Sequence, residues 1–186
     1  LESHRTRIVI KDKEISAEIH EVDLNAIPEE VKILSPYDEY PSLVDRELVL
    51  QNSRVIIEYL DERFPHPPLL PVDPISRAKF RLALNEIEHN WYSKYAEAYN
   101  DEVLDDNFVT QIKNYFLEIA PLIKKKFFMS DDFGLVDCSI APLLWRLKSL
   151  DFDLAENNKV IATYSERIFE REAFQDSLTE TEKELF

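Results

Sequence analysis

The sequence has 186 residues, of which 45% are hydrophobic and 32% charged, enough for one large globular domain or two small ones. No apolar run reaches the ~20 residues of a membrane span, and the first residues do not resemble a signal-peptide core. The single cysteine, Cys138, excludes an internal disulfide, so we expect a cytoplasmic protein. The net charge of −15 opposes contact with a phosphate backbone, so we expect no direct nucleic-acid binding. This charge either serves solubility or attracts a basic protein partner.

The first 64 residues predict a small α/β unit. Apolar spacing predicts a helix over residues 5–13, and apolar–polar alternation predicts a short strand over residues 14–23. A proline suited to a first helical turn opens a helix over residues 28–34. Residues 42–50 predict a hairpin, and Ser53 is expected to cap the helix that follows. A strand ahead of the first helix would complete a familiar small fold.

The segment 65–74 interrupts every periodic pattern. It contains five prolines in ten residues. Proline fixes its own φ angle and has no N–H to donate, so this segment can be neither helix nor central strand. We therefore predict a stiff, extended connector and place a domain boundary here.

The residues after the connector predict helices alone. The longest apolar stripe has helical spacing and consists of Phe80, Leu84, Ile87, Trp91, Tyr95 and Ala98. A second helix over residues 109–119 is expected to end or kink at Pro121, and the nearly all-apolar segment 135–147 predicts a buried central helix. Residues 161–169 predict an amphipathic helix, and Thr179 is expected to cap a short final one.

This order of a small α/β unit, a proline-rich connector and a helical unit resembles the glutathione transferase superfamily. The segment Tyr40–Val44 resembles the motif in which a cis proline, here Pro41, precedes a strand. Asn52 and Ser53 lie where the superfamily has an acidic residue followed by serine at a helix start. The segment Gly134–Asp137 resembles the capping motif of the helical domain, in which Asp137 would accept a hydrogen bond from the Gly134 N–H.

The resemblance implies an α/β plus all-α fold. Residues 1–64 would form a thioredoxin-like domain, residues 65–74 the linker, and residues 75–186 an all-helical domain.

Within this superfamily the sequence is similar to the stringent starvation protein A family. The matching segments are Leu43–Leu48, Glu58–Pro68, Leu135–Cys138, Ala141–Leu147 and Phe169–Arg171. The resemblance implies a homodimeric transcription regulator of the starvation and stress response. Such a protein would bind RNA polymerase and its sigma factor and would lack transferase activity.

The same resemblance assigns the partner-binding surface to Pro65, His66, Pro67 and Pro68, together with Tyr92. Proline rings present pre-ordered apolar surface, so docking them costs little conformational entropy. Tyr92 is one helical step away from the apolar stripe, so we expect its ring to face solvent beside the prolines. The alternative is that residues 65–68 are only a linker.

A glutathione-dependent transferase or thiol reductase is the alternative function. Its pocket would use Tyr40, Pro41, Asn52 and Ser53. Asn52 replaces the acid that would meet the ammonium group of glutathione, and losing a charged hydrogen bond costs about 1.5–3 kcal/mol. We therefore expect a vestigial pocket, and Pro41 and Ser53 could equally serve the fold alone.

Other chemistry has little support in the sequence. The four histidines, His4, His20, His66 and His89, have no metal-ligand spacing, so we expect no metal site. One glycine cannot form a phosphate-binding loop, so we expect no cofactor, and Cys138 is expected to be a core residue. A small-molecule sensor would need clustered Lys or Arg, and the only basic run is Lys124–Lys126.

Overall fold

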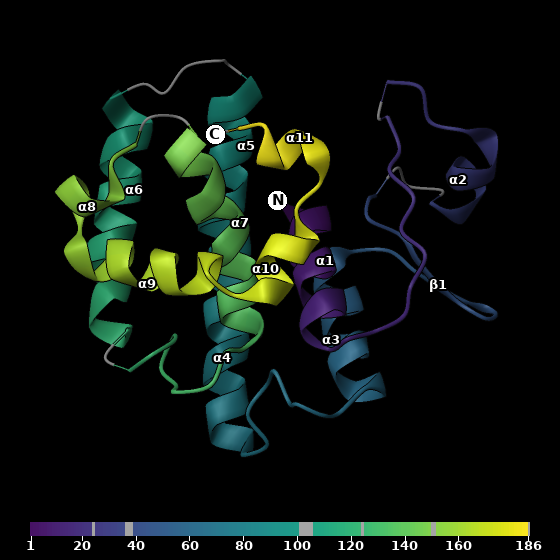
Figure 1. Cartoon of the computed structure of the whole chain (residues 1–186), viewed down its shortest axis with the longest axis horizontal. Coiled ribbons are helices and arrows are strands. Elements are labelled where there is room, and N and C mark those ends of the chain that lie inside the picture. Colours follow the sequence, from purple (N-terminus) through teal and green to yellow (C-terminus); the bar gives the residue numbers. More distant parts are fainter. Residues whose placement is uncertain (24, 36–38, 101–105, 124, 150–151, 186) are drawn as a thin grey trace.

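The computed structural model describes residues 1–186 except 24, 36–38, 101–105, 124, 150–151 and 186 (Figure 1). The N-terminal elements are α1 (Glu2–Asp12), α2 (Glu29–Leu34), β1 (Leu43–Asp45), β2 (Leu48–Leu50) and α3 (Ser53–Arg63). The later elements are α4 (Pro74–Glu86), a π-helical segment (Ile87–Tyr92), α5 (Ser93–Asn100), α6 (Asp106–Ile119), a 3₁₀ turn (Ala120–Leu122), α7 (Leu135–Ser149), α8 (Leu154–Asn157), α9 (Lys159–Phe169), α10 (Glu172–Ser177) and α11 (Glu180–Lys183).

The N-terminal part contains the predicted helices and the predicted hairpin. Strands β1 and β2 pair antiparallel, with Leu43 opposite Leu50. The prediction that Ser53 caps α3 is wrong, because Ser53 is already the first helical residue. Asn52 is the cap instead, and its side-chain oxygen accepts from the backbone N–H groups of Arg54 and Val55 at 3.0 and 3.3 Å.

The predicted strand over residues 14–23 is not a strand in the described part of this segment. Its residues are extended or irregular, and most are exposed. Among the described residues only β1 and β2 form a ladder. Apolar–polar alternation favours a strand only where a neighbour supplies hydrogen bonds, and no described segment does so here.

The predicted long helix is present as α4, the π-helical segment and α5, which follow one another without a break. The described members of its apolar stripe are buried: Phe80, Leu84, Ile87, Trp91 and Tyr95. The helix over residues 109–119 is α6, and the 3₁₀ turn that contains Pro121 ends it, as expected.

The start of α7 confirms the predicted cap. Asp137 Oδ2 accepts from the Gly134 N–H at 2.8 Å, while Oδ1 accepts from the Phe128 N–H and the Tyr164 hydroxyl at 2.9 and 2.6 Å. Burial raises the pKa of Asp137 to about 6, against these hydrogen bonds. A Cβ at Gly134 would lie 2.8 Å from the carbonyl oxygen of Leu69, so the approach of the connector requires glycine here.

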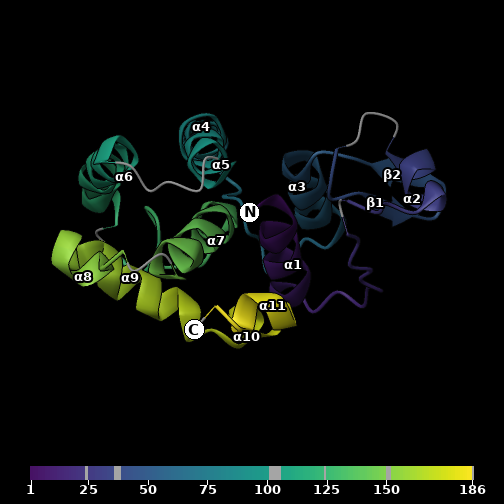
Figure 2. The same cartoon turned by 90° about the horizontal axis from the view of Figure 1, so that it is seen from above.

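Helix α1 occupies the centre of the molecule. Seen from above, it stands between α3 with the hairpin on one side and the larger group of helices on the other (Figure 2). It packs against α3, α7 and α10. Its buried residues therefore include polar ones as well as apolar ones: His4, Arg5, Thr6, Ile8, Val9 and Ile10. These polar side chains connect the two parts of the chain.

Candidate docking site at the connector

The segment Pro65–Pro68, here called the strap, lies on the surface. All four of its residues are exposed, whereas Leu69 and Leu70, which follow, are buried at 2% and 4% exposure. The His66–Pro67 peptide bond is cis. The strap thus presents one imidazole and three pyrrolidine rings to solvent and is anchored directly behind them.

A buried ion pair lies beneath the strap. The Lys13 side chain, at the C-terminal end of α1, has no exposed surface, and its Nζ lies 2.8 Å from Asp61 Oδ1 on α3. The same ammonium donates to the carbonyl oxygens of Phe64 and Pro67 at 2.6 and 2.7 Å. Asp61 in turn accepts from the N–H groups of Leu69 and Leu70 at 2.8 and 3.0 Å. No local sequence pattern revealed this pair, because its partners lie on two helices and the connector.

The prediction that the Tyr92 ring faces solvent is wrong. Tyr92 is 6% exposed, and its hydroxyl donates to the carbonyl oxygen of Ser139 on α7 at 2.7 Å. The Arg5 guanidinium lies 5.1 Å from its ring centroid, and burial raises the pKa of its hydroxyl. The cause is the π-helical segment, which takes more residues per turn than an α-helix and so changes the direction of each side chain. Trp91 faces α6 instead, 5.4 Å from the Tyr115 ring, as a core residue.

The residues expected in a vestigial glutathione pocket have other partners. The Tyr40–Pro41 bond is cis, as the motif predicted. Ser53 is 2% exposed, and its Oγ accepts from Nε and Nη2 of the buried Arg5 at 3.0 and 2.6 Å. The side chain of Asn52 is used as the α3 cap. The polar groups of Asn52 and Ser53 that a ligand would use are therefore engaged within the protein.

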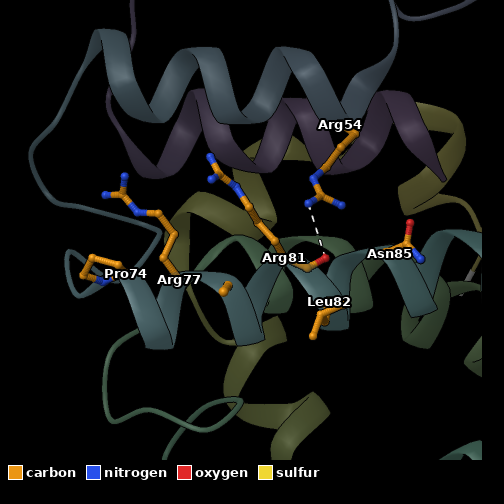
Figure 3. A pocket seen from close by; sticks show the side chains of 7 residues that line it. Arg54, Pro74, Arg77, Arg81, Leu82 and Asn85 are labelled. Atoms are coloured by element: carbon orange, nitrogen blue, oxygen red, sulfur yellow. Dashed lines mark hydrogen bonds between the residues drawn. The ribbon is translucent and has the colours of Figure 1, made fainter.

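A second surface feature was not predicted. A groove of about 740 Å³ lies between α3 and α4 and is lined by three arginines, Arg54, Arg77 and Arg81, with Pro74, Ala78, Leu82 and Asn85. Figure 3 shows the side chains of Arg77 and Arg81 pointing from α4 toward α3, and that of Arg54 pointing from α3 toward α4. The sequence shows no basic run here, because the arginines come from two helices.

The arginines of this groove are partly neutralised. Glu58 accepts from Arg54 Nε at 2.6 Å and from Arg81 Nη2 at 2.7 Å. Burial alone would raise the pKa of Glu58, but these hydrogen bonds lower it. Arg77 donates to the carbonyl oxygen of Pro71 at 2.9 Å.

Cys138 is the remaining candidate for covalent chemistry. Cys138 is fully buried, and burial raises the pKa of its thiol, as expected for a core residue. Among the residues that the structure describes, no three His, Cys, Asp or Glu side chains gather as metal ligands. None of the described helices is long and apolar enough to cross a bilayer.

Comparison with known proteins defines the class. Models of the glutathione S-transferase N-terminal and C-terminal domains match residues 2–68 and 72–172. A delta-class glutathione transferase of Nilaparvata lugens has the same fold, with a TM-score of 0.88 at 22% identity, covering 99% of this chain and 91% of that one. The molecule thus has the glutathione transferase fold, with a thioredoxin-like N-terminal part and a helical C-terminal part.

The particular branch follows from relatives of higher identity. A stringent starvation protein A homolog of Haemophilus influenzae is 48% identical over 180 residues, which are 95% of this chain and 85% of the relative. One from Pasteurella multocida is 46% identical over 178 residues, covering 94% of this chain and 84% of the relative. The chain belongs to the stringent starvation protein A family of glutathione S-transferase-like proteins.

Proposed function

We propose that this protein is a non-catalytic regulator of transcription in starvation and stress, which binds RNA polymerase and its sigma factor through the strap. The family resemblance suggests the partner, and the exposure of all four strap residues carries the proposal. A protein that binds RNA polymerase would act in the cytoplasm, so we propose that location. We propose that residues 1–64 form the thioredoxin-like domain, residues 65–74 the connector and residues 75–186 the helical domain.

The order of the strap and the charge of the protein both favour docking on the polymerase. A surface that is already ordered loses little freedom when it docks, so its ring contacts contribute more of their energy to affinity. The charge of −15 would speed the encounter with basic elements of the polymerase, while the rings supply specific contact. Because the Tyr92 ring is buried, we limit the docking surface to the strap.

The strap can be tested directly by replacing Pro65, His66, Pro67 and Pro68 together with alanine. We expect retention on immobilised polymerase holoenzyme to fall at least about tenfold, as for loss of a binding hot spot. The variant should remain folded, because the replaced side chains are exposed, and retention is compared at a temperature where both proteins are folded. Pro28→Ala, at an exposed proline ahead of α2, is the matched control and should bind normally. Unchanged retention of the fourfold variant would refute the proposal.

A glutathione-dependent enzyme remains the alternative. The resemblance of Tyr40 and Pro41 to the transferase motif favours it. The Ser53 hydroxyl, held by Arg5, and the capping role of Asn52 argue against it. Retention of the wild-type protein on immobilised glutathione would support the enzyme, and we expect none.

We also propose that two copies of the chain form a homodimer through the groove between α3 and α4. In the resembled family, the α/β domain of one copy packs against the helical domain of the other. The groove combines three guanidinium groups with the apolar side chain of Leu82, which is 67% exposed, and Ile75 on the same helix is 69% exposed. A second copy, itself strongly acidic, would match the arginines and cover the apolar face.

A further inference from the structure

The proline rings fix the φ angles within the strap, but the strap has few hydrogen bonds of its own that could hold it in one position on the fold. Pro65, Pro67 and Pro68 lack the backbone N–H, so within these four residues only His66 can donate a backbone hydrogen bond. The strap side chains are exposed, so core packing does not hold them. Groups outside the strap must therefore hold its backbone.

The Lys13–Asp61 pair meets this requirement on both sides of the strap. An ammonium group has three N–H donors, and Lys13 Nζ has three acceptors within 2.8 Å: Asp61 Oδ1 and the carbonyl oxygens of Phe64 and Pro67. The Asp61 carboxylate accepts from the two amides directly after the strap, those of Leu69 and Leu70. One buried pair thus bonds the backbone before, within and after the exposed rings.

Stability alone does not account for a charged pair at this position. A buried ion pair loses its hydration, and well-packed apolar residues of similar volume are often equally stable or better. Apolar packing between α1 and α3 is already available, since Val9, Ile57 and Leu60 are all buried in the common core. What apolar residues could not supply is hydrogen bonds to four backbone groups of a proline-rich segment.

We propose that Lys13 and Asp61 are positioning residues that hold the strap in the arrangement that binds its partner. This inference rests on the proposed function of the strap. The pair touches no partner itself. It acts through the backbone of Phe64–Leu70, and without it the strap would spread over several arrangements. If one arrangement in ten binds, the apparent dissociation constant rises about tenfold.

The experiment compares Lys13→Met with two matched controls on immobilised polymerase holoenzyme. Lys13→Met keeps the length of the side chain and removes all three donors. Lys11→Met makes the same replacement at an exposed lysine of the same helix. Arg171→Met removes the ion pair with Asp12, the neighbour of Lys13, and a guanidinium that lies 4.1 Å from the Phe133 ring centroid. It therefore disturbs the fold beside Lys13 without touching the strap.

We expect Lys13→Met to weaken retention at least about tenfold at a temperature where all variants are folded, and both controls to bind like the wild type. Hydrogen exchange distinguishes a local loosening of the strap backbone from a general loss of stability. The Leu69 and Leu70 amides should exchange faster in Lys13→Met relative to the α7 amides, and not in Arg171→Met.

The outcomes separate the two proposals. If the fourfold alanine variant loses binding while Lys13→Met binds normally, the positioning role is overturned and the docking surface stands. If the fourfold variant binds normally, both are overturned. If Arg171→Met loses binding as fully as Lys13→Met, loss of fold explains the effect and the positioning role is overturned.

A second variant covers the case in which Lys13→Met does not fold. Asp61→Asn keeps the shape of the side chain and an acceptor oxygen but removes the charge opposite Lys13. We expect it to weaken retention and to speed exchange at Leu69 and Leu70. Rapid exchange of both amides in the wild-type protein would by itself overturn the proposal, because it would show that the bonds to Asp61 do not hold.

Discussion

His4 is a buried histidine where α1 meets α7, α10 and α11. Its Nδ1 lies 3.2 Å from Arg146 Nη1, a group that can only donate, so Nδ1 is the acceptor and Nε2 carries the proton toward Ser177 Oγ at 3.1 Å. The imidazole is therefore neutral, and its 3.6 Å separation from Glu182 is not an ion pair. Burial lowers the pKa of His4 to about 3, aided by Arg146 and Arg7 and opposed by Glu182.

This histidine should make the protein sensitive to mild acid. The unfolded chain protonates His4 below its ordinary pKa of about 6.5, whereas the folded chain does so only near 3. Its contribution to stability is thus present above pH 6.5 and is lost as the pH falls from 6.5 toward 3. When the pH falls from 7.5 to 5.0, the free energy of unfolding of the wild type should fall by about 2 kcal/mol more than that of His4→Gln. Urea unfolding at the two pH values measures this difference.

The comparison with His4→Gln isolates this one group. Asp137 acts in the opposite direction: its pKa is raised in the folded state, so its ionisation lowers stability as the pH rises from about 4 to 6. Asp137 makes this contribution equally in the wild type and in His4→Gln, so it cancels in the difference between them. Equal pH dependence of the two proteins would contradict a neutral, buried His4.

At the scale of elements, α11 shows how a very short helix is held in place. Four residues cannot form a stable helix alone. Thr179 caps α11, as the sequence predicted, and the Glu182 side chain completes a capping box. The Glu182 carboxylate also accepts from Arg7 on α1 at 2.5 Å and from Arg146 on α7 at 2.6 Å, so tertiary contacts complete the helix.

Replacing Glu182 should release α11 from the rest of the molecule. Burial alone would raise the pKa of Glu182, but the hydrogen bond from the Thr179 amide and the charges of Arg7 and Arg146 hold it below its usual range. Glu182→Gln removes the charge between the two arginines and should lower the free energy of unfolding by about 3 kcal/mol. Chemical denaturation measures this, and exchange of the α11 amides should become faster.

Glu180→Gln is the matched control on the same helix. Glu180 is exposed and contacts Lys183 at 2.8 Å, so its replacement should cost less than about 0.5 kcal/mol. Similar losses for the two variants would contradict the anchoring role of Glu182.

At the scale of the whole molecule, the charge distribution is uneven. The chain carries 37 acidic and 22 basic residues, yet three arginines gather in the groove between α3 and α4. Exposed apolar side chains lie on the same helix α4. Exposed apolar side chains beside a basic groove suit a contact with another molecule, and our proposal assigns this face of α4 to a second copy.

A charge in this apolar face should separate the copies. We expect the wild type to sediment as a dimer and Leu82→Glu to dissociate at least about tenfold more readily, because the carboxylate would lose its hydration in the interface. Sedimentation velocity over a concentration series measures the dissociation constant. Leu117→Glu, at a 66% exposed leucine on α6, is the matched control and should remain dimeric. A wild type that is monomeric at tens of micromolar would refute the dimer.

The sequence by itself determined the features that depend on near neighbours. Helical apolar spacing predicted the long helix, and the nearly all-apolar segment 135–147 predicted the buried α7. The turn chemistry of residues 42–50 predicted the hairpin, and Gly134 with Asp137 predicted a cap that is present. Proline density likewise predicted a non-helical connector, and its strap is exposed. Each of these depends on residues within a few positions of one another, where spacing and backbone chemistry dominate.

Only the tertiary structure decided which side chains meet across the fold. It buried Tyr92, because a π-helical segment changed the phase that an ideal α-helix implies. It directed Arg5 to Ser53, Lys13 to Asp61 and the strap, and three arginines of two helices into one groove. The physical reason is that these contacts join residues distant in sequence, and their hydrogen bonds and ion pairs depend on how α1 and α3 pack rather than on any local pattern.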